Sequence, residues 1–103
     1  MNAVRDPKRR PTHPGEILRE DVLPSLGITQ GAFADALGVS RLTVSQLLHE
    51  HRALSPEMAI RLEKAIGGSA ESWLRMQEAV DLWDMRQHAE RFAMVEPLKR
   101  LAA

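Results

Sequence analysis

The sequence predicts an all-helical protein that forms one small domain. Its 103 residues match the length of a single domain, and a content of 44% hydrophobic and 27% charged residues is typical of globular proteins. Apolar residues recur at helical spacing between residues that cap helices. No stretch alternates apolar and polar residues over the length of a strand, so we expect five helices and no β-sheet.

The composition also excludes several classes of protein. No uncharged apolar run approaches the roughly 18 residues that a transmembrane helix needs. The basic N-terminal segment has no apolar stretch behind it, so we expect no secretory signal. Cysteine is absent, which excludes disulfide bonds, thiolate zinc sites and cysteine nucleophiles. These features favour a cytoplasmic protein.

Proline and an acidic residue mark the start of the first helix. Pro14 occupies the first helical position, where its missing N–H costs nothing, and Glu16 lies in the positive first turn. The side chains expected to point inward are Ile17, Leu18 and Val22. We expect the helix to end at about Leu23, because Pro24 disfavours helical backbone in the residue before it.

The next two helices are separated by a two-residue turn. Thr29 is expected to cap the second helix, and Gly38 ends it by adopting a left-handed conformation. After Val39, Ser40 caps a third helix that runs to about His49. Two helices joined by so short a turn cross steeply and form a helix-turn-helix unit, although a plain helical hairpin would show the same pattern.

The last two helices follow the same rules. Ser55-Pro56-Glu57 opens a fourth helix, which Gly67-Gly68 ends. A fifth helix starts at Ser69 or Ala70 and meets no glycine or proline until Pro97, which allows a length of up to about 24 residues. The inward side chains of the second and fourth helices would be Phe33, Ala34, Leu37, Ala59, Leu62 and Ile66.

The third helix has one apolar face and one polar face that includes a leucine. Val44, Leu47 and Leu48 cluster on the inner face. On the opposite face, Leu42 suits a DNA major groove, where it would meet thymine methyl groups, and Gln46 could pair with both polar edges of adenine. We therefore predict that this helix binds DNA through Ser40, Arg41, Leu42, Thr43, Ser45 and Gln46. Of these, Ser40, Thr43 and Ser45 are short enough to let the backbone approach phosphates.

Phosphate contacts are expected on either side of these residues. Gln30 starts the second helix, where backbone N–H groups and the helix dipole favour a phosphate, and Arg52 lies just past the third helix. The N-terminal arm, residues 1–11, contains four basic residues and one acidic residue, Asp6. This arm either contacts phosphates or is a solvated tail. Its basic residues are Arg5, Lys8, Arg9 and Arg10.

The helix-turn-helix segment resembles the phage-repressor (XRE) family in the pattern Gln30…Ala34…Gly38-Val39-Ser40…Val44-Ser45. The flanking segments are more specific. His13-Pro14-Gly15-Glu16-Ile17-Leu18, the block from Ser55 to Leu62 and the block from Gly67 to Gln77 resemble HigA-type antitoxins of type II toxin–antitoxin systems. One departure is the loop after the third helix, where the family often has Asn-Gly-Lys and this chain has His49-Glu50-His51-Arg52.

The resemblance implies an all-α, five-helix, phage-repressor-like fold with a long C-terminal helix. It further implies an antitoxin that neutralises a small RelE-like mRNA-cleaving ribonuclease and represses its own operon as a homodimer on operator DNA. A stand-alone repressor without a toxin is the alternative. We accordingly expect a DNA-binding core over residues 12–68 and a dimerising helix and tail over residues 69–103.

The fifth helix offers a dimer interface. Trp73, Met76, Val80 and Trp83 recur at spacings of three and four and form an apolar stripe, while other apolar residues occupy other faces. A helix that is apolar on more than one side must bury more than one side. The alternative is that this helix only caps a monomeric core. The tail after Pro97 could pack on the dimer, bind a toxin or fray.

No feature of the sequence indicates catalysis, a metal or a cofactor. Nucleophile, phosphate-loop and dinucleotide motifs are absent, and His49 and His51 would point in different directions on a helix. An enzyme that uses such a helical unit as a structural part, as cyanase does, would need more chain than follows the fourth helix. The acidic cluster on the first helix is either a solvated face or a docking patch for a basic toxin. Its members are Glu16, Glu20 and Asp21.

Overall fold

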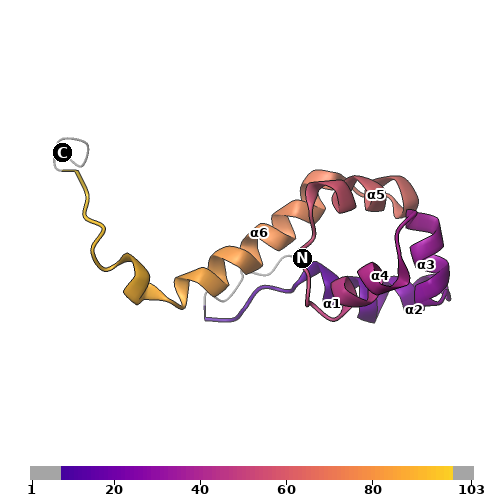
Figure 1. Ribbon diagram of the computed structural model, residues 1–103, viewed down its shortest axis with the longest axis horizontal. Coiled ribbons are helices and arrows are strands. Elements are labelled where there is room, and N and C mark those ends of the chain that lie inside the picture. Colours follow the sequence, from indigo (N-terminus) through magenta and orange to yellow (C-terminus); the bar gives the residue numbers. More distant parts are fainter. Residues whose placement is uncertain (1–7, 99–103) are drawn as a thin grey trace.

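The structure, a computed structural model, describes residues 8–98, and these form helices joined by short turns (Figure 1). In chain order the elements are α1 (Pro14–Ile17), η1 (Leu18–Val22), α2 (Leu23–Leu26), α3 (Gln30–Leu37), α4 (Arg41–Leu48), α5 (Pro56–Ile66), α6 (Ala70–Arg86) and η2 (Ala89–Phe92). Since α1, η1 and α2 follow one another without a break, the described chain has the five principal helices that the sequence predicts, and it contains no strand.

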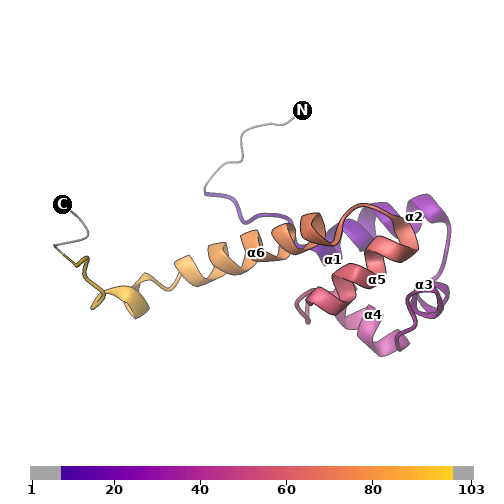
Figure 2. The same cartoon turned by 90° about the horizontal axis from the view of Figure 1, so that it is seen from above.

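The helices α1 to α5 form a globular body from which α6 projects (Figures 1 and 2). In both views the chain before α1 lies beside α6, while η2 and the following residues continue beyond the projecting end. Within the described part of the chain, no helix combines the length and the apolar character needed to cross a membrane. Because α6 projects from the body, one part of this helix packs against the body and the rest is open to a second molecule.

The first helix is longer than predicted. Pro24 does not end it, because the preceding segment η1 is a π-helical turn in which the N–H of Leu23 donates to the carbonyl of Leu18, five residues back. This wider turn accommodates a proline ring and its missing N–H without breaking the helix. The helix continues to Leu26 and ends at Gly27, whose φ of 66° is left-handed.

The predicted caps Thr29, Ser40 and Ser55 are confirmed, and Ser69, which was predicted only as a possible first residue of the last helix, is a cap as well. The side-chain oxygens of Thr29, Ser40, Ser55 and Ser69 each accept a hydrogen bond of 3.0 to 3.1 Å from the backbone N–H three residues later. Gly38 follows α3 with a φ of 73°, so the tight turn between α3 and α4 forms at the predicted residue. The local chemistry of the sequence thus places both helices of the helix-turn-helix unit.

The last helix is shorter than predicted. The absence of proline allowed about 24 residues, but α6 ends at Arg86 after 17 residues. His88 leaves the helical conformation, with φ of −108° and ψ of 55°. From Met85 to Leu98 every side chain is exposed, so no core contact supports further helical turns.

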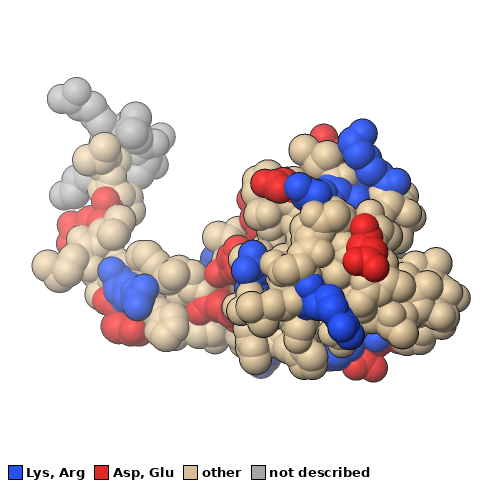
Figure 3. Space-filling model, turned by 45° about the vertical axis from the view of Figure 1, so that its right-hand side comes forward, with Lys and Arg blue, Asp and Glu red and all other residues tan. Residues whose placement is uncertain are grey.

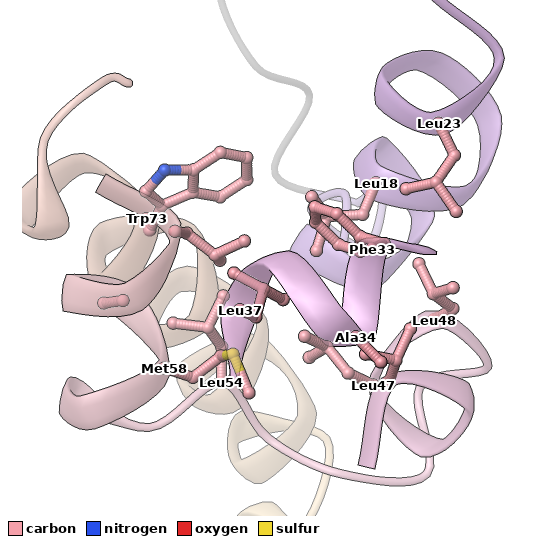
Figure 4. Close-up of a cluster of buried hydrophobic side chains, with 13 residues drawn as sticks. Leu18, Leu23, Phe33, Ala34, Leu37, Leu47, Leu48, Leu54, Met58 and Trp73 are labelled. Atoms are coloured by element: carbon pink, nitrogen blue, oxygen red, sulfur yellow. The ribbon is translucent and has the colours of Figure 1, made fainter. Parts of the chain in front are cut away.

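The core lies between the first helix and α3, α4 and α5, and the start of α6 closes it (Figure 4). Most of the side chains predicted to point inward are buried, and Ile17, Val22 and Ile66 are partly buried and pack against the cluster. Complete burial of one such large apolar side chain contributes about 1.5–3 kcal/mol. The core residues are Leu18, Leu23, Phe33, Ala34, Leu37, Val44, Leu47, Leu48, Leu54, Met58, Ala59, Leu62 and Trp73.

The inner side of α4 lies directly against α1. A Cβ atom at Gly15 would overlap the backbone carbonyl oxygen of Leu47, so only glycine permits this approach. The N–H of Gly15 donates to Nδ1 of His13, 2.8 Å away, and His13 is buried as the cap of α1. Burial lowers the pKa of His13, which keeps the ring neutral and able to accept. The first helix therefore fixes the back of α4.

Candidate nucleic-acid interface

The outer face of α4 is open to solvent in the protomer. Leu42 is 66% exposed, although it is a large apolar residue, and Arg41 beside it is exposed as well. Further along the helix, Thr43, Ser45 and Gln46 are half-buried. The inner residues Val44, Leu47 and Leu48 are buried, so α4 has the two faces that the sequence predicts. An open helix face of this composition has the shape and chemistry to enter a major groove.

Ser40 links the cap of α4 to the exposed face. Its hydroxyl accepts from the N–H of Thr43 and also lies 2.9 Å from the hydroxyl oxygen of Thr43. These contacts hold both short polar side chains close to the backbone. Beside Ser40 and Thr43, the start of α4 therefore presents little bulk, which allows a duplex backbone to approach it closely on this side.

Gln30 and Arg41 lie at the same end of the helix-turn-helix unit. Gln30 is the first residue of α3 and is half-buried. A Cβ atom placed on Gly31 would be 3.1 Å from Nε of Arg41, so the arginine extends across the first turn of α3. A guanidinium beside the positive end of a helix creates a site that favours an anion such as a phosphate.

Arg52 turns back onto the predicted base-reading glutamine. Its Nε and Nη2 atoms donate to Oε1 of Gln46 at 3.2 and 2.9 Å. The sequence predicts a phosphate contact for Arg52, and the structure adds this second role. Gln46 and Arg52 are therefore accessible from the same side of α4. Because a turn separates the two residues in the chain, the spacing rules for a single helix do not predict this contact.

Glu50 faces the protein's own arginines. Its carboxylate lies 3.2 Å from Nη1 of Arg10 and 3.7 Å from Nη1 of Arg19. Arg19 also donates to the carbonyl of Leu48 at the end of α4, and this role was not predicted. The negative charge of Glu50 is thereby balanced next to the predicted DNA-binding residues, and it does not oppose a phosphate as an isolated charge would.

Arg10 connects the arm to α6. Its Nε and Nη2 atoms donate to the two carboxylate oxygens of Asp84 at 2.8 and 2.9 Å. These hydrogen bonds raise the pKa of Arg10 and lower the pKa of Asp84. Arg5 and the rest of residues 1–7 lie outside the described residues. Basic and acidic side chains are interspersed on the globular face in Figure 3. Arg10, through its ion pairs with Asp84 and Glu50, belongs to a network of charges within the protein.

The predicted dimerisation residues separate into two groups. Trp73 and Val80 are only 8% and 1% exposed and fill the protomer's own core. Met76 and Trp83 are half-buried and retain surface that another molecule could cover. Trp83 also lines a groove beside the arm, together with Arg9 and Pro11. The dimerisation prediction therefore applies most directly to Trp83 and to the exposed apolar side chains near it, Leu82 and Met85.

The other candidate features remain surface features. The acidic residues Glu16, Glu20 and Asp21 are exposed, and Glu20 accepts a 2.8 Å hydrogen bond from Arg19. In residues 8–98, no three histidine, aspartate or glutamate side chains come together as a metal site would require. The tail after Pro97 lies outside the described residues except for Leu98, which is exposed.

Comparisons with known proteins agree with this geometry. The helix-turn-helix family matches residues 18–73. Antitoxin HigA-1 of Vibrio cholerae is 45% identical over 92% of this chain and 90% of its own length. The structure of the antitoxin GraA has a TM-score of 0.81 and 41% identity, over 87% of this chain and 99% of GraA. The structure of the Pseudomonas aeruginosa antitoxin HigA with the higBA promoter has a TM-score of 0.79 and 38% identity, over 86% of this chain and 99% of that one.

Proposed function

This chain belongs to the helix-turn-helix family of non-enzymatic DNA-binding proteins, among the HigA-type antitoxins, and we propose that it binds operator DNA and represses its own operon. We further propose that it binds and neutralises a RelE-like, mRNA-cleaving ribonuclease toxin. The observation that carries the DNA-binding proposal is the open outer face of α4, centred on Leu42. A similar protein of known structure, the Pseudomonas aeruginosa HigA, is bound to promoter DNA.

The proposed contacts follow from the chemistry of the exposed groups. The major groove is about 12 Å wide and admits an α-helix, so α4 enters it with Leu42 against a thymine methyl group and Gln46 at a base edge. Gln30 and Arg41 bind a phosphate at one end of the unit, and Arg52 lies near the backbone at the other. The short side chains of Ser40, Thr43 and Ser45 allow this close approach.

We propose that the protein binds its operator as a homodimer. One helix-turn-helix unit reads one half-site, and a dimer reads two half-sites about 34 Å apart. The projecting helix α6 carries Leu82, Trp83 and Met85 on surface that the body does not cover fully. Burial of these side chains between two copies would contribute apolar area to a dimer interface.

The toxin proposal is based on family membership and on charge. A ribonuclease that holds RNA needs a basic surface, and the exposed carboxylates of Glu16 and Asp21 are available to attract one. Such attraction speeds association and weakens as salt concentration rises.

The test uses DNA from upstream of the protein's own gene and the product of the adjacent gene. We expect the protein to retard this DNA at concentrations of about 10⁻⁸ M or below at physiological salt, and unrelated DNA only at concentrations at least about a thousandfold higher. Equal retardation of both DNAs would contradict the repressor role.

The toxin is tested separately by co-expression of the two genes and by copurification in moderate and high salt. We expect the adjacent product to copurify, and expression of this protein to relieve growth arrest and mRNA cleavage. If the two products neither copurify nor affect one another's activity, the protein is a stand-alone repressor.

A further inference from the structure

We propose that Arg52 is a specificity-determining residue that acts through Gln46: it holds the carboxamide oxygen, so that the pair offers only hydrogen-bond donors and selects guanine. The inference rests on the proposed DNA-binding function, because it states which base Gln46 prefers when α4 is bound to DNA. It also changes the expectation from sequence, in which Gln46 alone would read adenine.

The hydrogen bonds to Oε1 determine which atoms Gln46 has left to offer. A carbonyl oxygen has two lone pairs, and here the two N–H groups of Arg52 converge on one oxygen at 3.2 and 2.9 Å. The amide nitrogen Nε2 carries two donor hydrogens, and no group within residues 8–98 accepts from it. In this arrangement Gln46 acts as a donor and not as a combined donor and acceptor.

The turn after α4 holds Arg52 in this position. The N–H of His51 donates to the backbone carbonyl of Gln46 at 2.8 Å, and Glu50 adopts a left-handed φ of 62°. The Glu50 carboxylate pairs with Arg10 and Arg19. The backbone therefore turns back towards Gln46, which brings the Arg52 side chain within hydrogen-bonding distance of its Oε1 atom.

The base edges in the major groove distinguish a glutamine that both donates and accepts from one that can only donate. Adenine presents an acceptor, N7, beside a donor, the N6 amino group, so it matches a glutamine that can both donate and accept. Guanine presents two acceptors, N7 and O6. With Oε1 occupied, Gln46 cannot accept from an adenine amino group, whereas Nε2 and the remaining N–H groups of Arg52 match both guanine acceptors.

The proposal makes a different prediction from a simple phosphate contact. An arginine that binds only a phosphate lowers the affinity for every sequence alike when it is removed, and it reduces the salt dependence. Arg52 in the proposed role also changes which base is preferred at one position, and this effect requires Gln46. Arg41 is a matched control because it is an exposed arginine of the same interface whose guanidinium lies over Gly31 and not over Gln46.

The experiment begins with selection of binding sites for the wild-type protein from a random duplex library. Dissociation constants are then measured for duplexes with each of the four base pairs at every position, using the wild type, Arg52→Met, Gln46→Ala, the double variant and Arg41→Met. Thermal unfolding of each variant confirms that it is folded; because Arg52 is exposed, we expect Arg52→Met to retain the fold.

At the position where Gln46→Ala abolishes the base preference, we expect the wild type to favour guanine over adenine by about fivefold or more. Arg52→Met should shift that preference towards adenine, Arg41→Met should keep it, and the double variant should match Gln46→Ala. A wild-type preference for adenine, or an unchanged preference in Arg52→Met with a uniform loss of affinity, would overturn the proposal. A wild type that selects no sequence would instead refute the DNA-binding function itself.

Discussion

Arg10 and Asp84 are 74 residues apart in the chain and are joined by two side-chain hydrogen bonds of 2.8 and 2.9 Å. The pair fastens the arm to the outer half of α6, and Arg10 also reaches Glu50 in the turn that follows α4. One guanidinium therefore connects three parts of the chain: the arm, the turn after α4 and the projecting helix.

Loss of this pair should release the arm while the fold persists. We expect Asp84→Asn to lower the free energy of unfolding by no more than about 1 kcal/mol, because both side chains are 40% exposed or more. Trypsin should cleave the released arm faster after Lys8 and Arg9, whereas the bond after Arg10 resists trypsin because Pro11 follows it. The matched control is Asp81→Asn, since Asp81 accepts from Gln77. Equal cleavage rates in both variants would show that the pair does not restrain the arm.

His13 should make stability depend on pH near neutrality. Burial places its folded-state pKa below the ordinary value of 6.5, so the unfolded chain binds a proton more readily than the folded protein does. The stabilisation is complete above pH 6.5 and decreases as the pH falls towards the folded-state pKa.

Urea denaturation at several pH values between about 5.5 and 7.5 tests the role of His13. We expect the free energy of unfolding of the wild type to stay constant above about pH 6.5 and to decrease as the pH falls below that value. His13→Asn retains a side-chain oxygen that can cap α1 but does not titrate, so its stability should vary less with pH. Identical pH profiles for the two proteins would place the titrating group elsewhere.

Gly15→Ala should destabilise the protein. The added Cβ would overlap the carbonyl oxygen of Leu47, and α1 and α4 would have to move apart. Overpacking of this kind costs about 1–3 kcal/mol, which chemical denaturation can measure. Gly31→Ala is the control, since its added Cβ would meet only the movable side chain of Arg41. Equal stability of the two variants would contradict the close approach of α1 to α4 at Gly15.

Trp83→Ala should shift the protein from dimer towards monomer in sedimentation velocity. Trp83 is half-buried and lies beside Leu82, which is 46% exposed, so a second copy could cover both. Met94→Ala removes a side chain that is 92% exposed in the tail and serves as the control. An unaltered dimer in Trp83→Ala would move the interface away from this part of α6.

The local features of the fold follow from the sequence, whereas the pairs between distant residues do not. Capping by Ser40 or Ser55 depends on atoms only three residues away, and Gly38 is needed where the backbone is left-handed, so these could be predicted. The inner face of α4 followed from helical periodicity. In contrast, the contacts of Arg10 with Asp84 and of Glu50 with Arg19 depend on how the helices pack.

Two helix ends were mispredicted for identifiable reasons. Pro24 normally indicates a helix end, but the π-helical turn before it absorbs the proline. The length of α6 was overestimated because the absence of proline permits a helix without stabilising it, and the side chains after Met85 have no core to pack on. The pair between Gln46 and Arg52 was missed because a turn separates the two residues and no periodicity relates them.

Replacement of Leu42 by glutamate tests the central claim, that the outer face of α4 enters the DNA major groove. Gel shifts should compare Leu42→Glu with Ile60→Glu, a matched change on α5, because both residues are large, apolar and exposed, at 66% and 48%. A carboxylate inside the groove would face the phosphates, so we expect Leu42→Glu to weaken operator binding by about tenfold or more and Ile60→Glu to bind like the wild type. Equal, undiminished binding by both folded variants would contradict the account.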